Sequence, residues 1–454
     1  MNRPVLIIQL AKLGDFIQST SLLAKIRQHC PGAPIVLAAA QPSVQQAASL
    51  SPLVDMVVET GPAPSGQIQL KSLEPFAAIF VLNSHPEAAA LAVGLKNETY
   101  FGPRLTDGEL IFTPAQRFLM AVMAECRSLG RFNLVDVWAS LLPGAPSPAT
   151  VWPTMAAVTN RNYLPNKIRR IGFQLSSRNH LRRWPVERFA EFSDVLSMTL
   201  EHGWTPVLLG SAEEKAFGRR FEKLTNVTAE NLIGCTDLKT LGDAVSGLDL
   251  LLTGDTGVMH LAAAVNTPVL SLFFGPAYGP ETGPYGSGHI IYQAAAACAP
   301  CRESSDCRRR QCLEMPDAEI AASLAAAMLQ GGSHLLTNDL LAAMPPCHRV
   351  WSTVKDEFGQ NLKPLARPHL TPDETLALIL TEAGRGVINS GYQPEAKNLV
   401  DIFTAYDDVS QVLSVNVSQL KRLTDNAFGE ASRQGTNFLK MMVELAENFG
   451  VKIA

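Results

Sequence analysis

The sequence lacks several features that would assign it to a class at once. It contains no uninterrupted run of 18 apolar residues, which is about the length that a membrane-spanning helix requires. The first apolar stretch, residues 5–10, is too short for a signal peptide, and no small-residue cleavage site follows it. The net charge is −4, without the basic excess that is typical of nucleic-acid-binding proteins. We therefore expect a cytoplasmic protein that has no nucleic-acid partner.

Cysteine and charge are also scarce. Eight cysteines among 454 residues are too few for a disulfide framework, although four of them lie close together between positions 298 and 312. Charged residues make up only 18% of the chain and hydrophobic residues 46%, which indicates a globular protein with a substantial core. The length predicts two or three domains.

What the chain does contain is an alternation of strand and helix patterns. Continuous apolar runs are typical of strands that are covered on both faces in a parallel sheet. In the first half we expect strands at 5–10, 35–39, 55–58 and 76–82, short helices at 44–50 and 88–95, and a helix around Leu22, Leu23 and Ile26 that ends at Pro31 and Gly32. In the second half we expect strands at 168–175, 206–209, 231–234, 248–252 and 268–274, with helices at 186–202, 238–247 and 317–329. This alternation predicts two doubly wound α/β domains.

The domain boundaries follow from changes in composition. A stretch rich in Pro, Ala and Ser at 142–153 is typical of a linker. We therefore expect an N-terminal domain over 1–150, a second domain over 151–332 and a helical extension without strands over 333–454. Two interpretations remain for residues 99–148, either an acceptor cleft or a surface insertion.

The stretch 251–264 combines a buried strand, a glycine turn and a helix start. Asp255 or Thr256 can cap the helix, and Gly257 and His260 both lie in its first turn. Unpaired backbone N–H groups at such a turn attract anions, because the helix dipole adds to the donors. The alternative is an ordinary capped turn without a ligand.

Two further turns lie at expected carboxyl ends of strands, where ligands bind in open α/β sheets. Lys12, Gly14 and Asp15 follow the first strand, and the dinucleotide fingerprint G-x-G-x-x-G is absent there. Ser176 and Ser177 follow the strand at 168–175 beside Arg178, Arg182 and Arg183, and Glu213 and Glu214 follow the strand at 206–209. Hydroxyls and guanidinium groups suit a diphosphate, and carboxylates suit ribose hydroxyls. Solvated loop residues and helix caps are the alternative for each.

Three blocks of this sequence resemble glycosyltransferase family 9, the ADP-heptose:lipopolysaccharide heptosyltransferases. The first is Leu10-Ala11-Lys12-Leu13-Gly14-Asp15 with Ser19-Thr20. The second runs from Ser176-Ser177 to Arg182-Arg183-Trp184-Pro185. The third and most specific is Asp255-Thr256-Gly257-Val258-Met259-His260-Leu261-Ala262-Ala263, with Thr267-Pro268 and Phe274-Gly275-Pro276 after it. The resemblance covers about residues 4–330. It implies a GT-B fold, in which two Rossmann-like domains face a cleft, and inverting transfer from an ADP-heptose-like nucleotide sugar.

The resemblance also implies roles for matching residues. Asp15 resembles the general base, with Lys12 and Gly14 beside it as acceptor or donor contacts. Arg182 stands where the family has a diphosphate-binding lysine. Nucleotide-sugar binding is implied for the remaining positions, where Asp255 is expected to order its loop: Ser176, Ser177, Glu213 or Glu214, Asp255, Thr256, Gly257 and His260. Transfer of this kind requires no metal or other cofactor, because positive charge already faces the leaving group.

The four clustered cysteines are Cys298, Cys301, Cys307 and Cys312. A C-x2-C pair favours tetrahedral Zn or Fe, so a structural metal is one expectation for this loop. Free thiols and a pair of disulfides are the others. The loop bears a loose similarity to the iron-binding cysteine finger of some heptosyltransferases that modify autotransporters.

The remaining functional alternatives concern ligands and the extension. The acceptor is expected to be a saccharide, a lipid-linked saccharide met at the inner face of the inner membrane through peripheral association, or a protein. Other nucleotide-sugar donors stay open, and so does a non-catalytic scaffold of the same fold. The extension over 333–454 has no motif that chooses between homo-oligomerisation and acceptor docking.

Overall fold

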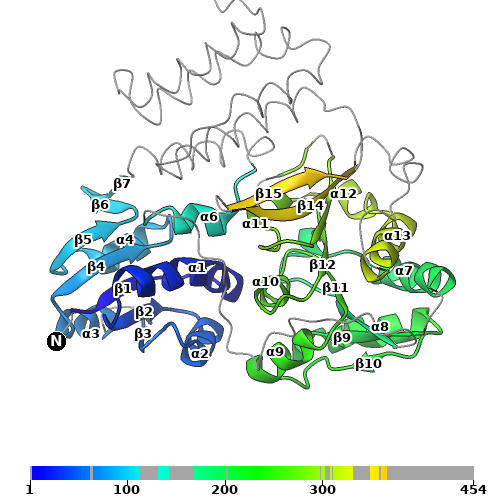
Figure 1. Cartoon of the computed structure of the whole chain (residues 1–454), viewed down its shortest axis with the longest axis horizontal. Coiled ribbons are helices and arrows are strands. Elements are labelled where there is room, and N and C mark those ends of the chain that lie inside the picture. The colour runs from blue at the N-terminus through cyan, green and yellow to red at the C-terminus, as the bar shows by residue number, and fades with distance from the viewer. Residues whose placement is uncertain are drawn as a thin grey trace, which may run out of the picture.

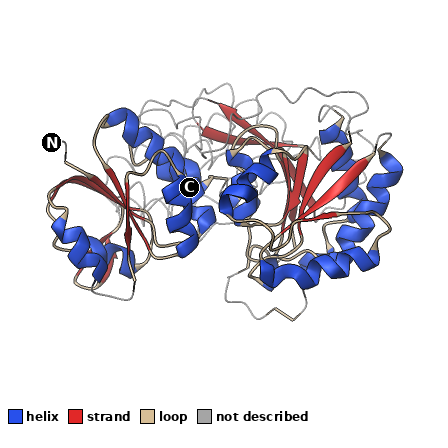
Figure 2. Cartoon of the chain, turned by 90° about the horizontal axis from the view of Figure 1, so that it is seen from below, coloured by secondary structure: helices blue, strands red, loops and turns tan. Residues whose placement is uncertain are grey.

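The structure is a computed structural model that describes residues 3–61, 65–111, 131–142, 168–200, 203–296, 298–301, 307–308, 310–330, 348–356 and 359–365. Two sheets stand at opposite sides of the described part, and helices from both lie between them (Figures 1 and 2). The predicted pair of Rossmann-like domains is therefore confirmed. The expected helical extension from residue 366 onward lies outside the described residues.

The first sheet has the strand order β3-β2-β1-β4-β5, and all of its neighbouring strands are parallel. Every residue of β1 is buried, which explains why its sequence is continuously apolar rather than alternating. The strands are β1 (Val5–Ile8), β2 (Ile35–Ala39), β3 (Met56–Glu59), β4 (Phe76–Val81) and β5 (Asn97–Phe101). The helices are α1 (Leu13–His29), α2 (Pro42–Leu50), α3 (Ser65–Ser72), α4 (Pro86–Ala92) and α6 (Leu134–Ala139).

The second sheet has the order β10-β9-β8-β11-β12-β13-β14-β15. It is parallel from β10 to β13, and the hairpin β14–β15 continues it in the antiparallel sense. Its strands are β8 (Arg169–Gln174), β9 (Trp204–Leu209), β10 (Glu230–Asn231), β11 (Leu250–Thr253), β12 (Val269–Phe273), β13 (Ile290–Ala294), β14 (His348–Asp356) and β15 (Gly359–Pro364). Its helices are η1 (His180–Arg182), α7 (Val186–Thr199), η2 (Ala212–Glu214), α8 (Lys215–Leu224), α9 (Leu238–Ser246), α10 (Gly257–Ala264), α11 (Gly279–Thr282), α12 (Gln311–Glu314) and α13 (Ala318–Leu329).

Two predictions about the chain's organisation are wrong in part. The segment from 333 was expected to lack strands, yet β14 and β15 complete the second sheet, with Val350, Trp351 and Leu362 buried. Residues 99–148 are no simple insertion, because β5 is the edge strand of the first sheet. They also contain a short hairpin of β6 (Arg104–Thr106) and β7 (Glu109–Ile111), and helix α6.

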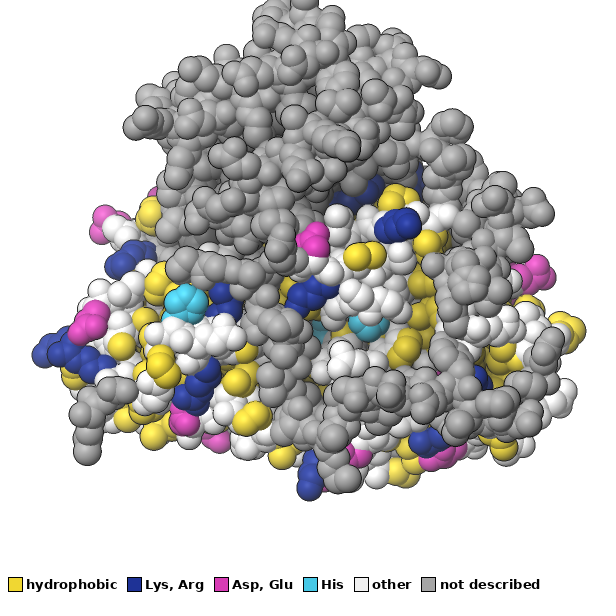
Figure 3. All heavy atoms as spheres, viewed as in Figure 1, with side chains coloured by type: hydrophobic (Ala, Val, Ile, Leu, Met, Phe, Trp, Pro, Cys, Tyr) yellow, Lys and Arg dark blue, Asp and Glu magenta, His cyan; other side chains and the backbone are white. Residues whose placement is uncertain are grey.

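One hydrophobic core joins the two halves. It contains Phe16 and Leu23 of α1 together with Met259 of α10 and Trp351 of β14. Helix α1 packs against both α10 and α6, so the helix that begins at the Asp15 motif also forms the centre of the interface. Basic, acidic and hydrophobic side chains are interspersed on the face seen in Figure 3. Within the described ranges, no helix combines the length and the apolar character that crossing a bilayer demands.

Candidate functional site at the junction of two helix N-termini

The carboxyl end of β1 leads into α1, and the N-terminus of α1 meets the N-terminus of α10. A β-carbon placed on Gly14 would lie 2.7 Å from Cδ2 of His260, which is closer than side-chain carbons approach. A β-carbon placed on Gly257 would lie 3.7 Å from the backbone nitrogen of Gly14. The absence of a side chain at Gly14 therefore permits the two turns to touch. The motif around Asp15 and the motif around Thr256, which are distant in sequence, lie side by side in the structure.

Asp15 lies in the first turn of α1 and is half-buried. Its Oδ2 accepts a hydrogen bond from the backbone N–H of Lys12 at 3.1 Å, so the carboxylate closes the start of the helix. Lys12 itself is exposed. Since that bond engages one carboxylate oxygen, the other remains a candidate acceptor for the proton of a substrate hydroxyl.

The turn after β11 is built by short polar contacts. Thr256 is the N-cap of α10 and accepts from the backbone N–H of Met259, while its Oγ1 lies 3.0 Å from Oγ1 of the buried Thr253. Gly254 needs to be glycine, because a β-carbon there would lie 2.9 Å from the carbonyl oxygen of Arg182. This close approach places η1 directly beside the start of α10.

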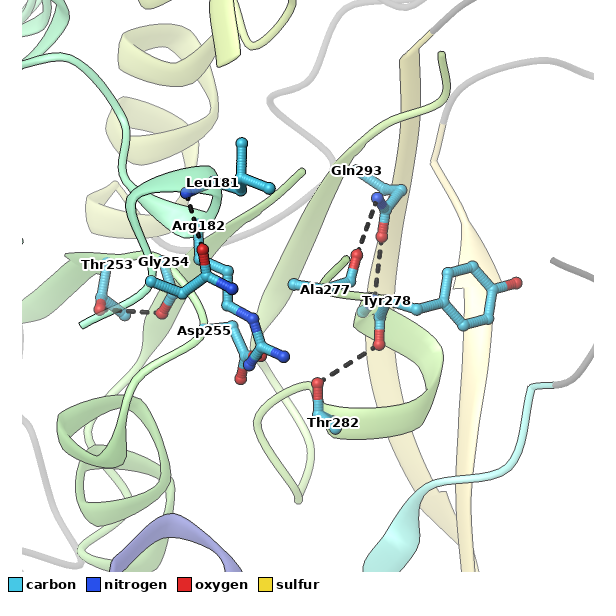
Figure 4. A network of polar contacts seen from close by, with 11 residues as sticks. Leu181, Arg182, Thr253, Gly254, Asp255, Ala277, Tyr278, Thr282 and Gln293 are labelled. Carbon is cyan, nitrogen blue, oxygen red and sulfur yellow. Dashed lines mark hydrogen bonds and ion pairs between the residues drawn. The ribbon is translucent and has the colours of Figure 1, made fainter. Parts of the chain in front are cut away.

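Arg182 and Asp255 point toward one another across this approach (Figure 4). Nη1 of Arg182 donates to Oδ2 of Asp255 at 2.5 Å, and both side chains are largely buried. The ion pair fixes the guanidinium at the N-terminus of α10, where a diphosphate would lie. The plane of the guanidinium carries further N–H groups that can serve an anion.

His260 is buried against Gly14, within the electrostatic influence of Asp15. Burial lowers the pKa of His260 to about 4, and the attraction of Asp15 opposes this effect only in part. The imidazole is therefore neutral at pH 7, and it can donate one hydrogen bond and accept another without adding charge.

A second group of polar residues lies at the ends of β8 and β9. Ser176 is buried and Ser177 half-buried, and the backbone carbonyl of Ser177 accepts from Nη2 of Arg183 at 2.7 Å. Oε2 of Glu214 accepts from the N–H of Ser211 at 2.7 Å, and Nε2 of Gln174 lies 3.4 Å from the same carboxylate. These contacts aim Glu214 toward the end of β8.

The two candidate glutamates thus differ in environment. Glu213 is exposed, whereas Glu214 is half-buried in the polar group at the strand ends. Sequence reasoning did not separate the two, because both occupy the first turn of the same short helix. It placed Arg183 beside Ser176 and Ser177 as a possible diphosphate ligand, but it missed Gln174 as a member of this group. The position of Gln174 at the end of the predicted strand was the available signal.

The four cysteines form a separate cluster beside η1. The N–H of Cys301 donates to the carbonyl of Gly275 at the end of β12, and none of the four cysteines is joined in a disulfide. Burial raises the pKa of the Cys312 thiol, and the neighbouring Cys298, Cys301 and Cys307 raise it further. The other three thiols therefore lie within electrostatic range of Cys312. Among the described residues, however, no three His, Cys, Asp or Glu are arranged to hold a metal ion.

Comparison with known proteins supports the family resemblance. The model of glycosyltransferase family 9 (heptosyltransferase) matches residues 144–311. Lipooligosaccharide heptosyltransferase 2 of Haemophilus influenzae is 32% identical over 109 residues, which is 23% of this chain and 29% of that protein. Lipopolysaccharide heptosyltransferase 2 of Escherichia coli is 32% identical over 105 residues, covering 22% of this chain and 28% of that protein. The chain thus matches less than a third of the length of either relative.

Solved structures support the fold over a longer stretch. A glycosyltransferase family 9 protein of Veillonella parvula superposes with a TM-score of 0.53 at 16% identity, covering 73% of this chain and 99% of that chain. The ADP-heptose lipopolysaccharide heptosyltransferase II of Escherichia coli gives a TM-score of 0.51 at 19% identity, covering 72% and 99%. Residues 144–311 thus resemble glycosyltransferase family 9, and the described part of the chain shares the fold of these two solved proteins.

Proposed function

We propose that this chain is an inverting glycosyltransferase that moves a heptose or a similar sugar from an ADP-sugar to an acceptor hydroxyl. The observation that carries the proposal is the contact between Gly14 and His260. It brings the only carboxylate of the α1 turn, Asp15, to the anion-attracting start of α10. A base and a leaving-group site must lie this close for a single displacement to proceed.

The roles of the residues follow from their chemistry. Asp15 takes the proton of the acceptor hydroxyl as its oxygen forms a bond to the anomeric carbon. The bond between that carbon and the diphosphate oxygen breaks on the opposite face, which inverts the configuration. The departing diphosphate gains negative charge, and Arg182 and the N–H groups at Thr256 and Gly257 stabilise it. Asp255 positions Arg182 through the ion pair.

Two helix N-termini acting together strengthen this proposal. Each contributes a partial positive charge, and the first turns of α1 and α10 lie against each other at Gly14 and Gly257. His260 is neutral there and can donate a hydrogen bond to a phosphate oxygen. Ser176, Ser177 and Glu214 would bind the nucleoside side of the donor, with Glu214 rather than Glu213 on the ribose hydroxyls. Lys12 and Gly14 would line the acceptor side.

The donor is tested by incubating the full chain with a panel of nucleotide sugars and measuring the release of nucleoside diphosphate. We expect turnover with an ADP-sugar, with ADP-heptose preferred over ADP-glucose. Turnover with only UDP-sugars or only GDP-sugars would contradict the proposed ADP-sugar donor and would identify a different nucleotide-sugar donor. If no member of the panel is bound or turned over, the chain is a scaffold with this fold.

The acceptor class is a further part of the proposal. The curated relatives are named for lipopolysaccharide and lipooligosaccharide, so a lipid-linked saccharide is the acceptor that we propose first. A protein or a free saccharide acceptor would fit the same chemistry. We place the reaction in the cytoplasm, with the chain meeting a lipid-linked acceptor at the inner face of the inner membrane.

The cysteine cluster gives a separate prediction. Cys298, Cys301 and Cys307 lie near enough to Cys312 to raise the pKa of its thiol, and a C-x2-C pair is typical of Zn and Fe sites, so we expect a structural Zn or Fe ion to draw the four thiols together. We expect about one equivalent of metal per chain by elemental analysis, lost in Cys301→Ser and kept in Cys235→Ser, whose thiol lies outside the loop. Less than a tenth of an equivalent in the unaltered protein would contradict the site, and thiol titration would then separate free thiols from disulfides.

A further inference from the structure

Two consecutive arginines turn to opposite sides of β8. Arg182 reaches Asp255 at the start of α10, which follows β11. Arg183 reaches α8, which follows β9, where its Cζ lies 4.6 Å from the centre of the Phe217 ring. Because β8 lies between β9 and β11 in the sheet, the two guanidinium groups flank the end of the same strand. A ligand that lies across this end meets one arginine at each side.

Arg183 is held in a fixed plane. Phe217 lies against its guanidinium, and Nη2 donates to the carbonyl of Ser177 at 2.7 Å. The side chain is half-buried, and burial lowers its pKa while the charge of Glu214 opposes that change. A guanidinium fixed by a ring and a hydrogen bond loses little conformational entropy when a second planar group stacks on it.

Glu214 lies between the two arginines along the proposed path of the nucleotide. It lies beside Arg183, and the proposed function assigns it to ribose hydroxyls. If the diphosphate lies at Arg182 and the ribose at Glu214, the base continues away from α10, toward Arg183 and Phe217. Along the sheet edge, Arg182, Glu214 and Arg183 therefore follow the order of diphosphate, ribose and base in a nucleoside diphosphate.

We infer that Arg183, stacked on Phe217, is the platform for the nucleobase of the donor and a determinant of affinity for nucleoside diphosphates over bare diphosphate. This inference rests on the proposed function and extends it to a residue that the family motifs leave without a role. The partner is a planar heterocyclic base, which would stack on the face of the guanidinium turned away from Phe217. Stacking of this kind tolerates different bases, so we expect it to strengthen binding more than it selects among purines.

The test compares two ligands on the full-length protein. By titration calorimetry we expect Arg183→Ala to weaken ADP binding about tenfold while inorganic pyrophosphate binding changes less than twofold. Arg183→Lys keeps the charge but not the plane, and it should weaken ADP binding almost as much. Arg188→Ala is the matched control, because Arg188 pairs with Glu191 on the surface of α7 and should change neither affinity.

The outcomes separate the inference from the proposed function. Equal losses of ADP and pyrophosphate binding in Arg183→Ala would show that Arg183 contacts phosphate and would overturn the platform. Unchanged ADP binding in Arg183→Ala would overturn it as well. If the unaltered protein binds pyrophosphate as tightly as ADP, the role of Arg183 as a base platform is wrong, whereas the proposed diphosphate site at Arg182 and α10 is supported. If it binds neither ligand, the proposed function is wrong and the inference falls with it.

Discussion

Replacing Asp15 by alanine is expected to abolish sugar transfer while ADP still binds. The carboxylate is the proposed general base, and assistance of that kind accounts for a factor of about 10²–10⁴ in rate. The nucleotide would contact α10, Arg182 and the ends of β8 and β9, none of which includes Asp15. We therefore expect a loss in kcat with an ADP affinity close to that of the unaltered protein.

Alanine also removes the bond from the N–H of Lys12, so a second variant is needed. Asparagine offers an oxygen to that N–H but is no base at neutral pH. Asp15→Asn should keep the helix start and still lose transfer by about 10²-fold or more. Transfer at the normal rate in Asp15→Asn, measured with a saturating donor, would show that another group takes the proton. If Asp15→Ala loses transfer activity but Asp15→Asn retains it, Asp15 stabilises the start of α1 and is not the general base.

Local patterns in the sequence predicted much of the fold. Strands such as β1, β2 and β11 are continuous apolar runs that end in turn residues, so their positions could be predicted within a few residues. Helix α7 was also predictable, because Pro185 precedes it and Gly203 lies beyond its end. These features depend only on neighbouring residues.

Other elements could not be predicted because their partners are distant in sequence. Strand β14 contains the strand-favouring residues Val350, Trp351 and Val354, but its place in the second sheet depends on pairing with β13, which is distant in sequence. Strand β5 is half-exposed at a sheet edge, where polar residues such as Asn97 and Glu98 obscure the strand signal. Its position follows from pairing with β4 rather than from propensity.

The candidate site shows the same division. Motif spacing predicted Asp15, Arg182 and the turn at Thr256 separately as candidate site residues. Their mutual arrangement depends on Gly14 touching His260 and on Gly254 touching the backbone of Arg182. Contacts between turns that are distant in sequence produce no periodic pattern that could predict them. Gly14 and Gly254 do not adopt positive φ, so a turn pattern would not have predicted the need for glycine there.

Replacing Asp136 by alanine is expected to lower the free energy of unfolding by about 3 kcal/mol, because two buried donors lose a charged acceptor. Asp136 lies on α6 and is buried. Its Oδ1 accepts from the hydroxyl of Tyr285 at 2.5 Å, and its Oδ2 accepts from the N–H of Gln360 at 3.0 Å. The carboxylate thereby attaches α6 to the β14–β15 hairpin of the second sheet.

The same helix is attached to α1 by a buried lysine. Nζ of Lys25 donates to the carbonyls of Ala139 and Leu142, each at 2.8 Å. Burial lowers the pKa of Lys25 to about 8, and Asp136 opposes that shift. Without Asp136 the pKa of Lys25 should fall further, and so should that of Lys355, which burial lowers and Asp136 likewise raises. Because the folded state then binds fewer protons than the unfolded state, the destabilisation should be largest below the pKa of Lys25 and should decrease above it.

Denaturant unfolding at pH 7 and pH 9.5 measures both effects. Asp136→Ala should unfold at a lower midpoint than the unaltered protein, with a smaller difference at pH 9.5 than at pH 7. Asp243→Ala is the matched control, since Asp243 is an exposed aspartate on α9 and its loss should change stability by less than about 0.5 kcal/mol. Equal midpoints for Asp136→Ala and Asp243→Ala would mean that α6 does not hold the two sheets together. If Asp136→Ala unfolds earlier at both pH values by the same amount, the hydrogen bonds to Tyr285 and Gln360 account for the whole loss, and Lys25 and Lys355 contribute nothing to it.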